Sequence, residues 1–389
     1  MTPQRLSHST EISTLLDGQL KGVQSRDEAR SLTIQSIAAT DLQGSVAVRW
    51  QELRRRSVKF ESPYFDIEFT KAVARIRDDV EIAIAVDESE TIQAFFPFQR
   101  VAPSRAVPVG GRLSDVHGLI GSGELGDELI RRIMKEMKLR SYAFHAGLKT
   151  NQDLASHDFE LRDTYFMDLS QGWENYIQWA KSNSVTIKRQ GQKTRALERK
   201  FGPLRFEFDC QSYDVLEKLI ELKSKKYQRS NTFDILGVEW AADLLREIHQ
   251  IQNSEFQGSL SALWAGEHLV ATHFGMLTDN VLHYWFPVFV SEFARYSPGT
   301  ELMLRVARQS AELGLSKVDL GFGDDPYKSR FCNGRGLVSC GQFGFSNVGF
   351  TAARQKYFLR KKLKRIPFKP VAKKMLRSFF PGYGKWNFS

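Results

Sequence analysis

The stretch from Ser259 to Phe286, SLSALWAGEHLVATHFGMLTDNVLHYWF, decides the fold class of this chain. Its apolar and β-branched runs, separated by polar turns, predict an antiparallel meander of three strands: Ser259–Trp264, His268–Met276 and Val281–Phe286. A predicted helix, Gly299–Leu313, and a predicted strand, Lys317–Gly321, follow. Because a strand that returns after a helix can lie parallel to its neighbour, this order predicts a mixed α/β sheet of the α+β kind, not a doubly wound Rossmann sheet.

Working outward, two predicted helices precede the meander, at about Tyr213–Gln228 and Glu239–Gln252. The first half of the chain presents a similar order: an edge strand, two helices, a hairpin, a further strand, a helix and a short strand. These are Ser31–Ala38, Asp41–Arg56 (with Asp41 as its cap), Pro63–Arg77, Val80–Val86 with Thr91–Phe98, Arg112–Leu119, Glu124–Lys138 and Ser141–Ala146.

Two local alignments relate the halves. Glu90–Ala94 falls on Glu267–Ala271 at an offset of 177 residues, and Ser141–Gly147 falls on Lys317–Gly323 at an offset of 176. Two matches at nearly one offset indicate a duplicated unit; the alternative is a coincidence between two common hairpin–helix–strand units. We therefore expect a loose segment at 1–30, domains at 31–165 and 166–350, and a basic tail at 351–389.

The composition fits a folded protein whose positive charge is concentrated at one end. The chain has 389 residues, of which 42% are hydrophobic, and a net charge of +10. Residues 326–389 hold 15 Lys or Arg and no acid, which leaves 40 basic and 45 acidic groups elsewhere. A nucleic-acid interface would therefore depend on the tail alone and is not expected. With three scattered cysteines, a polar N-terminus and no run of roughly 20 apolar residues, we expect a cytoplasmic protein without a metal site.

The segment 295–300, RYSPGT, lies between a predicted strand and a predicted amphipathic helix. Ser297 is a typical N-cap and Pro298 suits the first helical position. Because Gly299 has no side chain, an anion can approach the free amides of the first turn, up to Glu301, at the positive end of the helix. A pyrophosphate would fit such a site. The alternative is an ordinary capped helix, which Glu301 favours because it would repel a phosphate.

A second segment, DLGFGDDPYKSRF at 319–331, starts at a predicted strand end and turns through two glycines. The chain here resembles the CelD-like branch of the GNAT acyltransferases, which is found with bacterial exopolysaccharide genes. That branch carries a Ser-Pro-Gly helix start, a D-L-G-x-G strand end and a P-Y-K element. These occur here, in that order, as Ser297–Gly299, Asp319–Gly323 and Pro326–Lys328. Weaker echoes reach forward to Trp50, Ser62–Pro63 and Ser114–His117.

The resemblance implies two GNAT-like folds in tandem, as in the related Fem aminoacyl transferases. It also implies an N- or O-acyltransferase that uses acetyl-CoA or another acyl-CoA and acts on a sugar or amino-sugar acceptor, free or lipid-linked, in surface polysaccharide biosynthesis. The donor pyrophosphate would lie on the loop that contains Arg295, Ser297, Gly299 and Thr300. The general GNAT pattern [QR]-x-x-G-x-[GA] is shifted here, because Pro298 takes the fourth position and the glycine comes one place late.

Acyl transfer from a thioester needs a base, a polarised carbonyl and a proton for the leaving thiolate. His273, on a predicted strand, is the candidate base, and His283 is a poorer one; the alternative for both is a histidine satisfied by packing. Tyr327 could protonate the thiolate and Lys328 could stabilise developing charge, unless they form an ordinary surface pair. We expect Asp319 to orient a partner or cap the following turn.

The basic stretch Lys188–Arg205 could rim the site and attract an anion, or be a solvated helix face. Two other functions stay open: a non-catalytic scaffold that binds a glycan or a synthase, and a Fem-like transferase that uses aminoacyl-tRNA. The second is disfavoured because no segment is long enough for the helical hairpin of Fem enzymes.

The tail is amphipathic as well as basic, with large apolar residues at helical spacing among its Lys and Arg side chains. Such a segment could hold the protein at the anionic inner face of the membrane. The alternative is a helix packed on the body of the protein.

Overall fold

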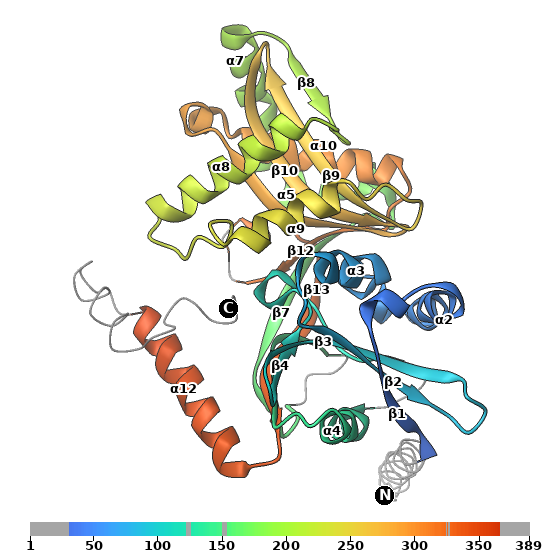
Figure 1. The fold of residues 1–389 in the computed structure, drawn as a ribbon. Helices are drawn as coiled ribbons and strands as arrows, with labels where there is room; N and C mark the ends of the chain where they lie inside the picture. The colour runs from blue at the N-terminus through green and yellow to red at the C-terminus, as the bar shows by residue number, and fades with distance from the viewer. Residues whose placement is uncertain (1–30, 122–125, 150–153, 324, 326, 366–389) are drawn as a thin grey trace, which may run out of the picture.

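The computed structural model describes residues 31–121, 126–149, 154–323, 325 and 327–365. The predicted loose segment 1–30, the tail beyond Arg365, and Asp324 and Pro326 lie outside the described residues. One large mixed sheet runs through the described part of the molecule, and helices cover it (Figure 1).

The strands are β1 (Thr33–Ile37), β2 (Val80–Val86), β3 (Ile92–Ala102), β4 (Arg105–Pro108), β5 (Ile120–Gly121), β6 (Ser141–Lys149), β7 (Asp158–Asp168), β8 (Leu204–Glu207), β9 (Phe256–Ala265), β10 (His268–Thr278), β11 (Val281–Phe289), β12 (Lys317–Phe322) and β13 (Gly334–Gly344). The α-helices are α2 (Gly44–Arg55), α3 (Ile67–Ile76), α4 (Gly126–Glu136), α5 (Gly172–Asn183), α6 (Val185–Lys188), α7 (Gln190–Phe201), α8 (Tyr213–Arg229), α9 (Glu239–His249), α10 (Pro298–Glu312), α11 (Lys328–Phe331) and α12 (Asn347–Arg365). Short 3-10 turns are η1 (Ala39–Asp41), η2 (Val58–Phe60), η3 (Pro63–Phe65), η4 (Gly111–Leu113) and η5 (Ser291–Tyr296).

The strand order repeats from both edges of the sheet toward its middle. The order is β1-β2-β3-β4-β6-β13-β7-β12-β11-β10-β9-β8, with β5 beside β3. Equivalent strands of the two halves start 176 residues apart: β3 and β10 at 92 and 268, β4 and β11 at 105 and 281, β6 and β12 at 141 and 317, and β7 and β13 at 158 and 334. The repeat seen in the sequence is therefore confirmed. We call residues 31–168 the first unit and residues 172–344 the second unit.

The two units exchange their last strands. β7 of the first unit pairs antiparallel with β12 of the second, and β13 of the second unit pairs antiparallel with β6 of the first. β7 and β13 also pair with each other, from Phe166 opposite Gly334 to Asp158 opposite Gly341. Neither unit completes its sheet alone, and the domain boundary expected after residue 165 falls inside β7.

Most of the predicted elements occur with their ends shifted by a few residues, but two predictions are wrong. Asp41 lies in η1 and does not cap α2, whose N-cap is Gln43. The strand expected at 112–119 is η4 followed by an irregular loop, and β4 takes its place in the sheet. The reason is local: Gly110 and Gly111 have φ values of 78° and 51°, which turn the chain out of the sheet.

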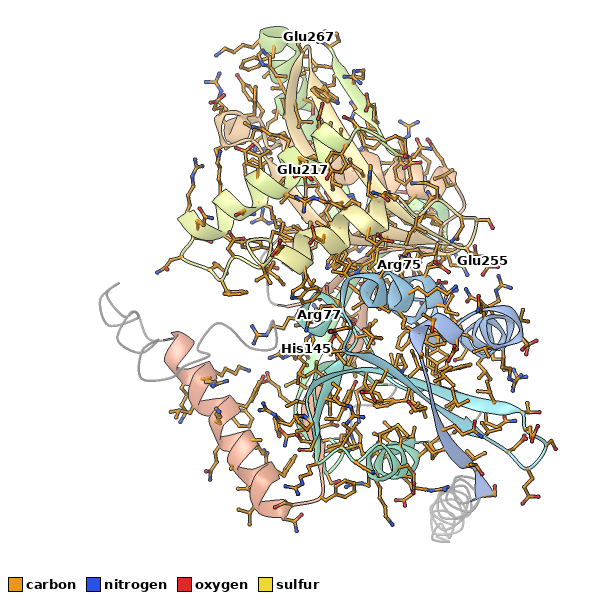
Figure 2. The ribbon with its side chains drawn as sticks, in the orientation of Figure 1. Arg75, Arg77, His145, Glu217, Glu255 and Glu267 are labelled. Atoms are coloured by element: carbon orange, nitrogen blue, oxygen red, sulfur yellow. The ribbon has the colours of Figure 1, made fainter. Side chains whose placement is uncertain are left out.

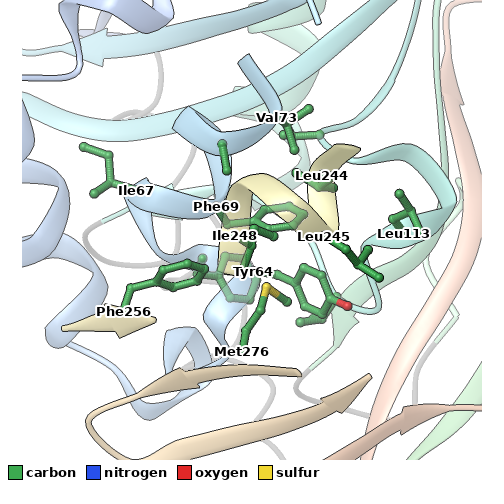
Figure 3. Close-up of a cluster of buried hydrophobic side chains, with 14 of the residues drawn as sticks. Tyr64, Ile67, Phe69, Val73, Leu113, Leu244, Leu245, Ile248, Phe256 and Met276 are labelled. Atoms are coloured by element: carbon green, nitrogen blue, oxygen red, sulfur yellow. The ribbon is translucent and has the colours of Figure 1, made fainter. Parts of the chain in front are cut away.

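One hydrophobic core spans the junction between the units. Figure 3 shows first-unit side chains packed against second-unit ones: Tyr64, Phe69 and Val73 with Leu244, Leu245, Ile248, Phe256 and Met276. Each fully buried side chain of this kind contributes roughly 1.5–3 kcal/mol. Ion pairs between Arg75 and Glu247 and, at 2.6 Å, between Arg55 and Glu255 also join the units (Figure 2). Side chains from both units can therefore form one site.

Candidate functional site

The parallel strands β11 and β12 separate at the junction. Their pairing covers Val281 with Lys317 through His283 with Asp319 and stops there, although β11 continues to Phe289. On the other side of β11, the register with β10 shifts between Phe274 and Met276. The carboxyl ends of parallel strands are where ligands enter mixed sheets, and irregular strand pairing is common next to active sites. The opening beyond His283 is therefore the first place to look for chemistry.

His283 lies completely buried at this opening, between carboxylates from both units. Its Nε2 is 3.4 Å from Oδ2 of Asp115 in the first unit, and its Nδ1 is 3.5 Å from Oδ2 of Asp319 on β12. The Tyr64 hydroxyl lies 3.0 Å from the same Nε2. Burial alone would lower the pKa of His283, but the two carboxylates outweigh it and raise the pKa to about 9. His283 is therefore an imidazolium near neutral pH.

The cation in turn keeps its partner ionised. Burial raises the pKa of Asp319, but the imidazolium of His283, 3.5 Å away, lowers it by more, so the net shift is downward. Asp319 also accepts a 2.8 Å hydrogen bond from the amide of Gly321. Gly321 has a φ of 67°, and a Cβ there would lie 2.2 Å from Oδ2 of Asp115. The glycine of the D-L-G-x-G element thus makes room for the first-unit carboxylate.

The charge of Asp115 acts on three tyrosines. Burial is the main reason why the pKa values of Tyr64, Tyr227 and Tyr327 are raised, and the charge of Asp115 contributes to all three shifts. Their hydroxyls therefore stay protonated and can donate hydrogen bonds or a proton. The side chain of Asp115 is 24% exposed and that of Asp319 is 18% exposed, so a substrate can reach both carboxylates.

Two buried lysines support the opening. Lys223 of α8 donates a 2.9 Å hydrogen bond to the carbonyl of Pro287, in the part of β11 beyond its pairing with β12, and burial lowers the pKa of Lys223 to about 7. Lys328 donates a 2.6 Å bond to the carbonyl of Phe322 and lies 3.8 Å from Oδ2 of Asp325. Lys328 thus holds the turn after β12, and Tyr327 precedes it at the same turn.

His273 lies on β10, inside the protein. It is completely buried, stacks on Tyr284 with ring centroids 3.9 Å apart, and has no hydrogen-bond partner among the described residues. Burial, with the charges of His283 and Lys223, lowers its pKa well below the usual value. His273 is therefore a neutral histidine in the interior, behind the opening. Asp319, Tyr327 and Lys328, in contrast, lie around the opening itself.

The helix start predicted to bind an anion lies at the far end of β11. Pro298 opens α10 and Ser297 is its N-cap residue, as expected, but Ser297 adopts a left-handed conformation (φ 53°) and its side chain makes no capping hydrogen bond. Its hydroxyl instead accepts a 2.8 Å hydrogen bond from Lys193. The amides of Thr300 and Glu301 are not free, because both bond to the carbonyl of Ser297 at 3.0 and 3.3 Å.

The surroundings of this helix start remain suited to an anion. Glu301, which would repel a phosphate, is held by Thr194 at 2.7 Å and by Arg305 at 2.8 Å. Lys193, from the basic stretch, supplies positive charge at Ser297, and the exposed Arg295 lies over the ring of Tyr296 in the turn before the helix. A Cβ on Gly299 would lie 3.3 Å from the ring of Phe289, so the helix start touches the end of β11.

The sequence predicted Asp319, Tyr327 and Lys328 as members of one site but ranked two of their neighbours low. Asp115 appeared only as part of the weak Ser114–His117 echo, and His283 was ranked below His273. Lys223 lies on an ordinary amphipathic helix and gave no signal. The useful sign was the polar pair formed by His283 and Asp319 at matching positions of neighbouring strands.

Comparisons with known proteins agree with this architecture. Residues 186–329 match the family model of the acetyltransferase (GNAT) domain. The chain is similar to the C-terminal domain (DUF2156) of a protein described as a lysylphosphatidylglycerol synthetase from Agrobacterium fabrum, at 14% identity and a TM-score of 0.50, covering 80% of this chain and 95% of that one. For L-PGS from Bacillus licheniformis the identity is 12%, the TM-score 0.50 and the coverage 79% and 96%. A structure of FemX overlays less well, with 11% identity, a TM-score of 0.47 and coverage of 70% and 89%. No curated protein matches the chain.

The match and the internal repeat together show a mixed α/β fold of two tandem GNAT-like units, as expected. The CelD-like branch stays a prediction. Within the described residues, no group of His, Cys, Asp and Glu side chains is arranged to hold a metal ion, and no helix combines the length and apolar character needed to span a bilayer.

Proposed function

We propose that this chain is an acyl-CoA-dependent acyltransferase whose reaction takes place where β11 and β12 separate. The observation that carries the proposal is the combination, along one strand, of a helix start with Lys193 beside it at one end and the Asp115–His283–Asp319 group at the other. The match of residues 186–329 to an acetyltransferase domain supports acyl-CoA as the donor.

The length of β11 fits such a donor. From His283 to Phe289 the strand rises by roughly 20 Å at about 3.3 Å per residue. Phe289 contacts the helix start at Gly299, where Lys193 and Arg295 can meet a pyrophosphate. An extended pantetheine arm spans a distance of this order, so a diphosphate bound at the helix start leaves the thioester near His283.

Each residue at the opening has its own role in the proposed acyl transfer. Asp115, the more exposed of the two carboxylates, takes the proton of the acceptor hydroxyl or amine as this group attacks the thioester carbon. The new C–O or C–N bond forms, the C–S bond breaks, and Tyr327 supplies the proton that the thiolate needs. His283, held as a cation, lies between the two carboxylates and keeps Asp319 ionised, and Lys328 fixes the turn that carries Tyr327. Proton exchange with solvent resets Asp115 and Tyr327.

We further propose a sugar or amino-sugar acceptor in surface polysaccharide assembly, on the strength of the CelD-like motifs. The test is mass spectrometry of products formed from acetyl-CoA and a panel of nucleotide-linked amino sugars. Asp115→Asn should lower kcat/KM by about 10²- to 10⁴-fold, the usual contribution of general acid–base catalysis. Asp279→Asn, in the exposed turn after β10, is the matched control and should keep full activity. Full activity of Asp115→Asn would remove Asp115 from the mechanism.

The two other functions predict different results. A non-catalytic scaffold would give no product with any acceptor. An aminoacyl-tRNA-dependent transferase would leave acetyl-CoA unused and bind tRNA with a steep salt dependence.

A further inference from the structure

A cluster of arginines lies beside the proposed reaction centre, on the other side of β12 from β11. Arg112 belongs to η4, three residues before Asp115, and Arg162 lies on β7, which pairs with β12. The Arg162 guanidinium stacks over Phe322 at 5.5 Å, and Phe322 is the last residue of β12. The cluster and the Asp115–His283–Asp319 group are therefore joined through η4 and through β12.

α12 closes the cluster from the outside. Its Tyr357 accepts a 2.6 Å hydrogen bond from Arg162 and donates one of 2.6 Å to Glu160, which also pairs with Lys361. Arg360 of the same helix adds its charge to that of Arg162 at Arg112. In Figure 1, α12 lies along the side of the sheet, where it packs against β13.

Arg112 itself is held in an unusual setting. The side chain of Arg112 is exposed to solvent. The protein packed around it and the charges of Arg162 and Arg360 nevertheless lower its pKa. Among the described residues, no carboxylate lies within ion-pair distance of Arg112. Other basic side chains near the junction do have acidic partners, such as Lys149 with Asp158 at 3.0 Å. The charge of Glu160 acts on Arg162, but no such acid acts on Arg112 within the described part of the chain, and an anion bound beside it would offset its repulsion with the other arginines.

The neighbouring histidine does not supply that compensation. His145 lies near the middle of the sheet (Figure 2) and its Nε2 is 2.9 Å from the carbonyl of Ser114, to which it donates. Burial, with the charge of Arg112, lowers the pKa of His145 to about 3. His145 therefore stays neutral and fixes the loop between Arg112 and Asp115.

We propose that Arg112 and Arg162, with Arg360 above them, bind a phosphate or diphosphate group of the acceptor. This rests on the proposed function, because it assigns the second substrate of the same site. The planar guanidinium matches phosphate oxygens two at a time, which a single point charge does not. The position also fits: the donor approaches along β11, and neighbouring strands lie about 4.8 Å apart, so an anion held beside β7 brings the adjoining sugar toward Asp115.

A sugar can carry such a phosphate through a nucleotide or through a polyprenyl lipid. We therefore suggest calorimetric titration of the full chain with three probes: inorganic pyrophosphate, UDP and geranyl diphosphate. Each titration is done on the free protein and on protein saturated with CoA, so that the helix start at Gly299 is occupied in one arm. The tighter of UDP and geranyl diphosphate identifies the kind of carrier.

The variants are Arg112→Gln, Arg112→Lys and, as a matched control, Arg105→Gln, an exposed arginine of β4. Arg112→Gln should weaken binding of all three probes at least tenfold, Arg112→Lys should weaken it less, and Arg105→Gln should leave it unchanged. CoA binding should be the same in all variants. Unchanged pyrophosphate binding in Arg112→Gln, or equal losses in Arg105→Gln, would overturn the proposal.

The free-protein arm separates this inference from the proposed function. If CoA does not bind but Arg112→Gln still loses pyrophosphate, the anion site stands and the acyl-CoA proposal fails. If CoA binds and pyrophosphate does not bind to the CoA-saturated protein, the donor site stands and the acceptor site is wrong.

Discussion

Replacing His283 by glutamine should change how the stability of the protein depends on pH. The folded-state pKa of His283 is about 9, against a value of 6.5 for an unperturbed histidine. Because the folded state binds this proton more tightly, the ion pairs stabilise the fold fully below pH 6.5. Their contribution is lost as the pH rises from 6.5 through 9. At about 1.4 kcal/mol per pH unit, the loss amounts to about 3 kcal/mol.

Urea unfolding at pH 6.0, 7.5 and 9.5 measures this contribution. We expect the stability difference between the natural chain and His283→Gln to shrink by about 3 kcal/mol between the first and last pH values. His268→Gln is the control for an exposed histidine and should follow the natural chain in parallel. Parallel curves for His283→Gln and the natural chain would refute the charged His283 on which the mechanism depends.

His273→Gln provides a second comparison of opposite sign. Burial lowers the folded-state pKa of His273 well below 6.5, so its contribution is present above pH 6.5 and is lost as the pH falls below that value. Between pH 7.5 and 9.5 the stability of His273→Gln should parallel that of the natural chain. A dependence like that of His283→Gln would show that the two histidines have been assigned the wrong charge states.

Three further predictions follow from the same contacts. Gly321→Ala should lower kcat/KM at least tenfold with little loss of CoA binding, because a Cβ 2.2 Å from Oδ2 of Asp115 must displace that carboxylate; unchanged kinetics would contradict the placement of Asp115. Phe69→Ala should cost about 3–5 kcal/mol in urea unfolding, since its ring is 1% exposed in the core that joins the units; a loss below about 1 kcal/mol would show that the junction does not depend on this packing. In flotation with anionic vesicles, we expect the outer face of α12, where Val348, Phe358 and Leu359 are exposed, to bind in a salt-sensitive way that is lost when residues 351–389 are removed; failure to bind at low salt would leave α12 as a helix that only packs on the body.

The sequence predicted the repeated order of elements well because each element has a strong local pattern. The meander of β9, β10 and β11 alternates or runs apolar, and α10 has Pro298 at its start. The exchange of β7 and β13 could not be predicted, since a strand's own residues do not specify which unit's edge it joins. The offset of 176 residues also relates β7 to β13, so the two exchanged strands are equivalent members of the repeat.

The site was harder to predict for a related reason. Asp115 reaches His283 only because Gly110 and Gly111 turn the chain out of the sheet and because the units share a core. Reading 112–119 as a strand hid that loop, and with it the role of Asp115. His273 and His283 look alike in sequence, one on each of two adjacent strands. The two histidines differ in charge because Asp115 and Asp319 flank His283 alone. Asp115 is far from His283 in the chain, and Asp319 lies on the neighbouring strand β12.

The central claim, an acyl-CoA donor bound along β11, is tested most directly by titrating acetyl-CoA into the protein in a calorimeter. The account predicts one site per chain and saturation below millimolar ligand. Binding should be weakened at least tenfold in Gly299→Asp, which adds a carboxylate to the helix start, and less in the uncharged Gly299→Asn. No heat of binding at millimolar acetyl-CoA, or equal binding by the natural chain and Gly299→Asp, would contradict it.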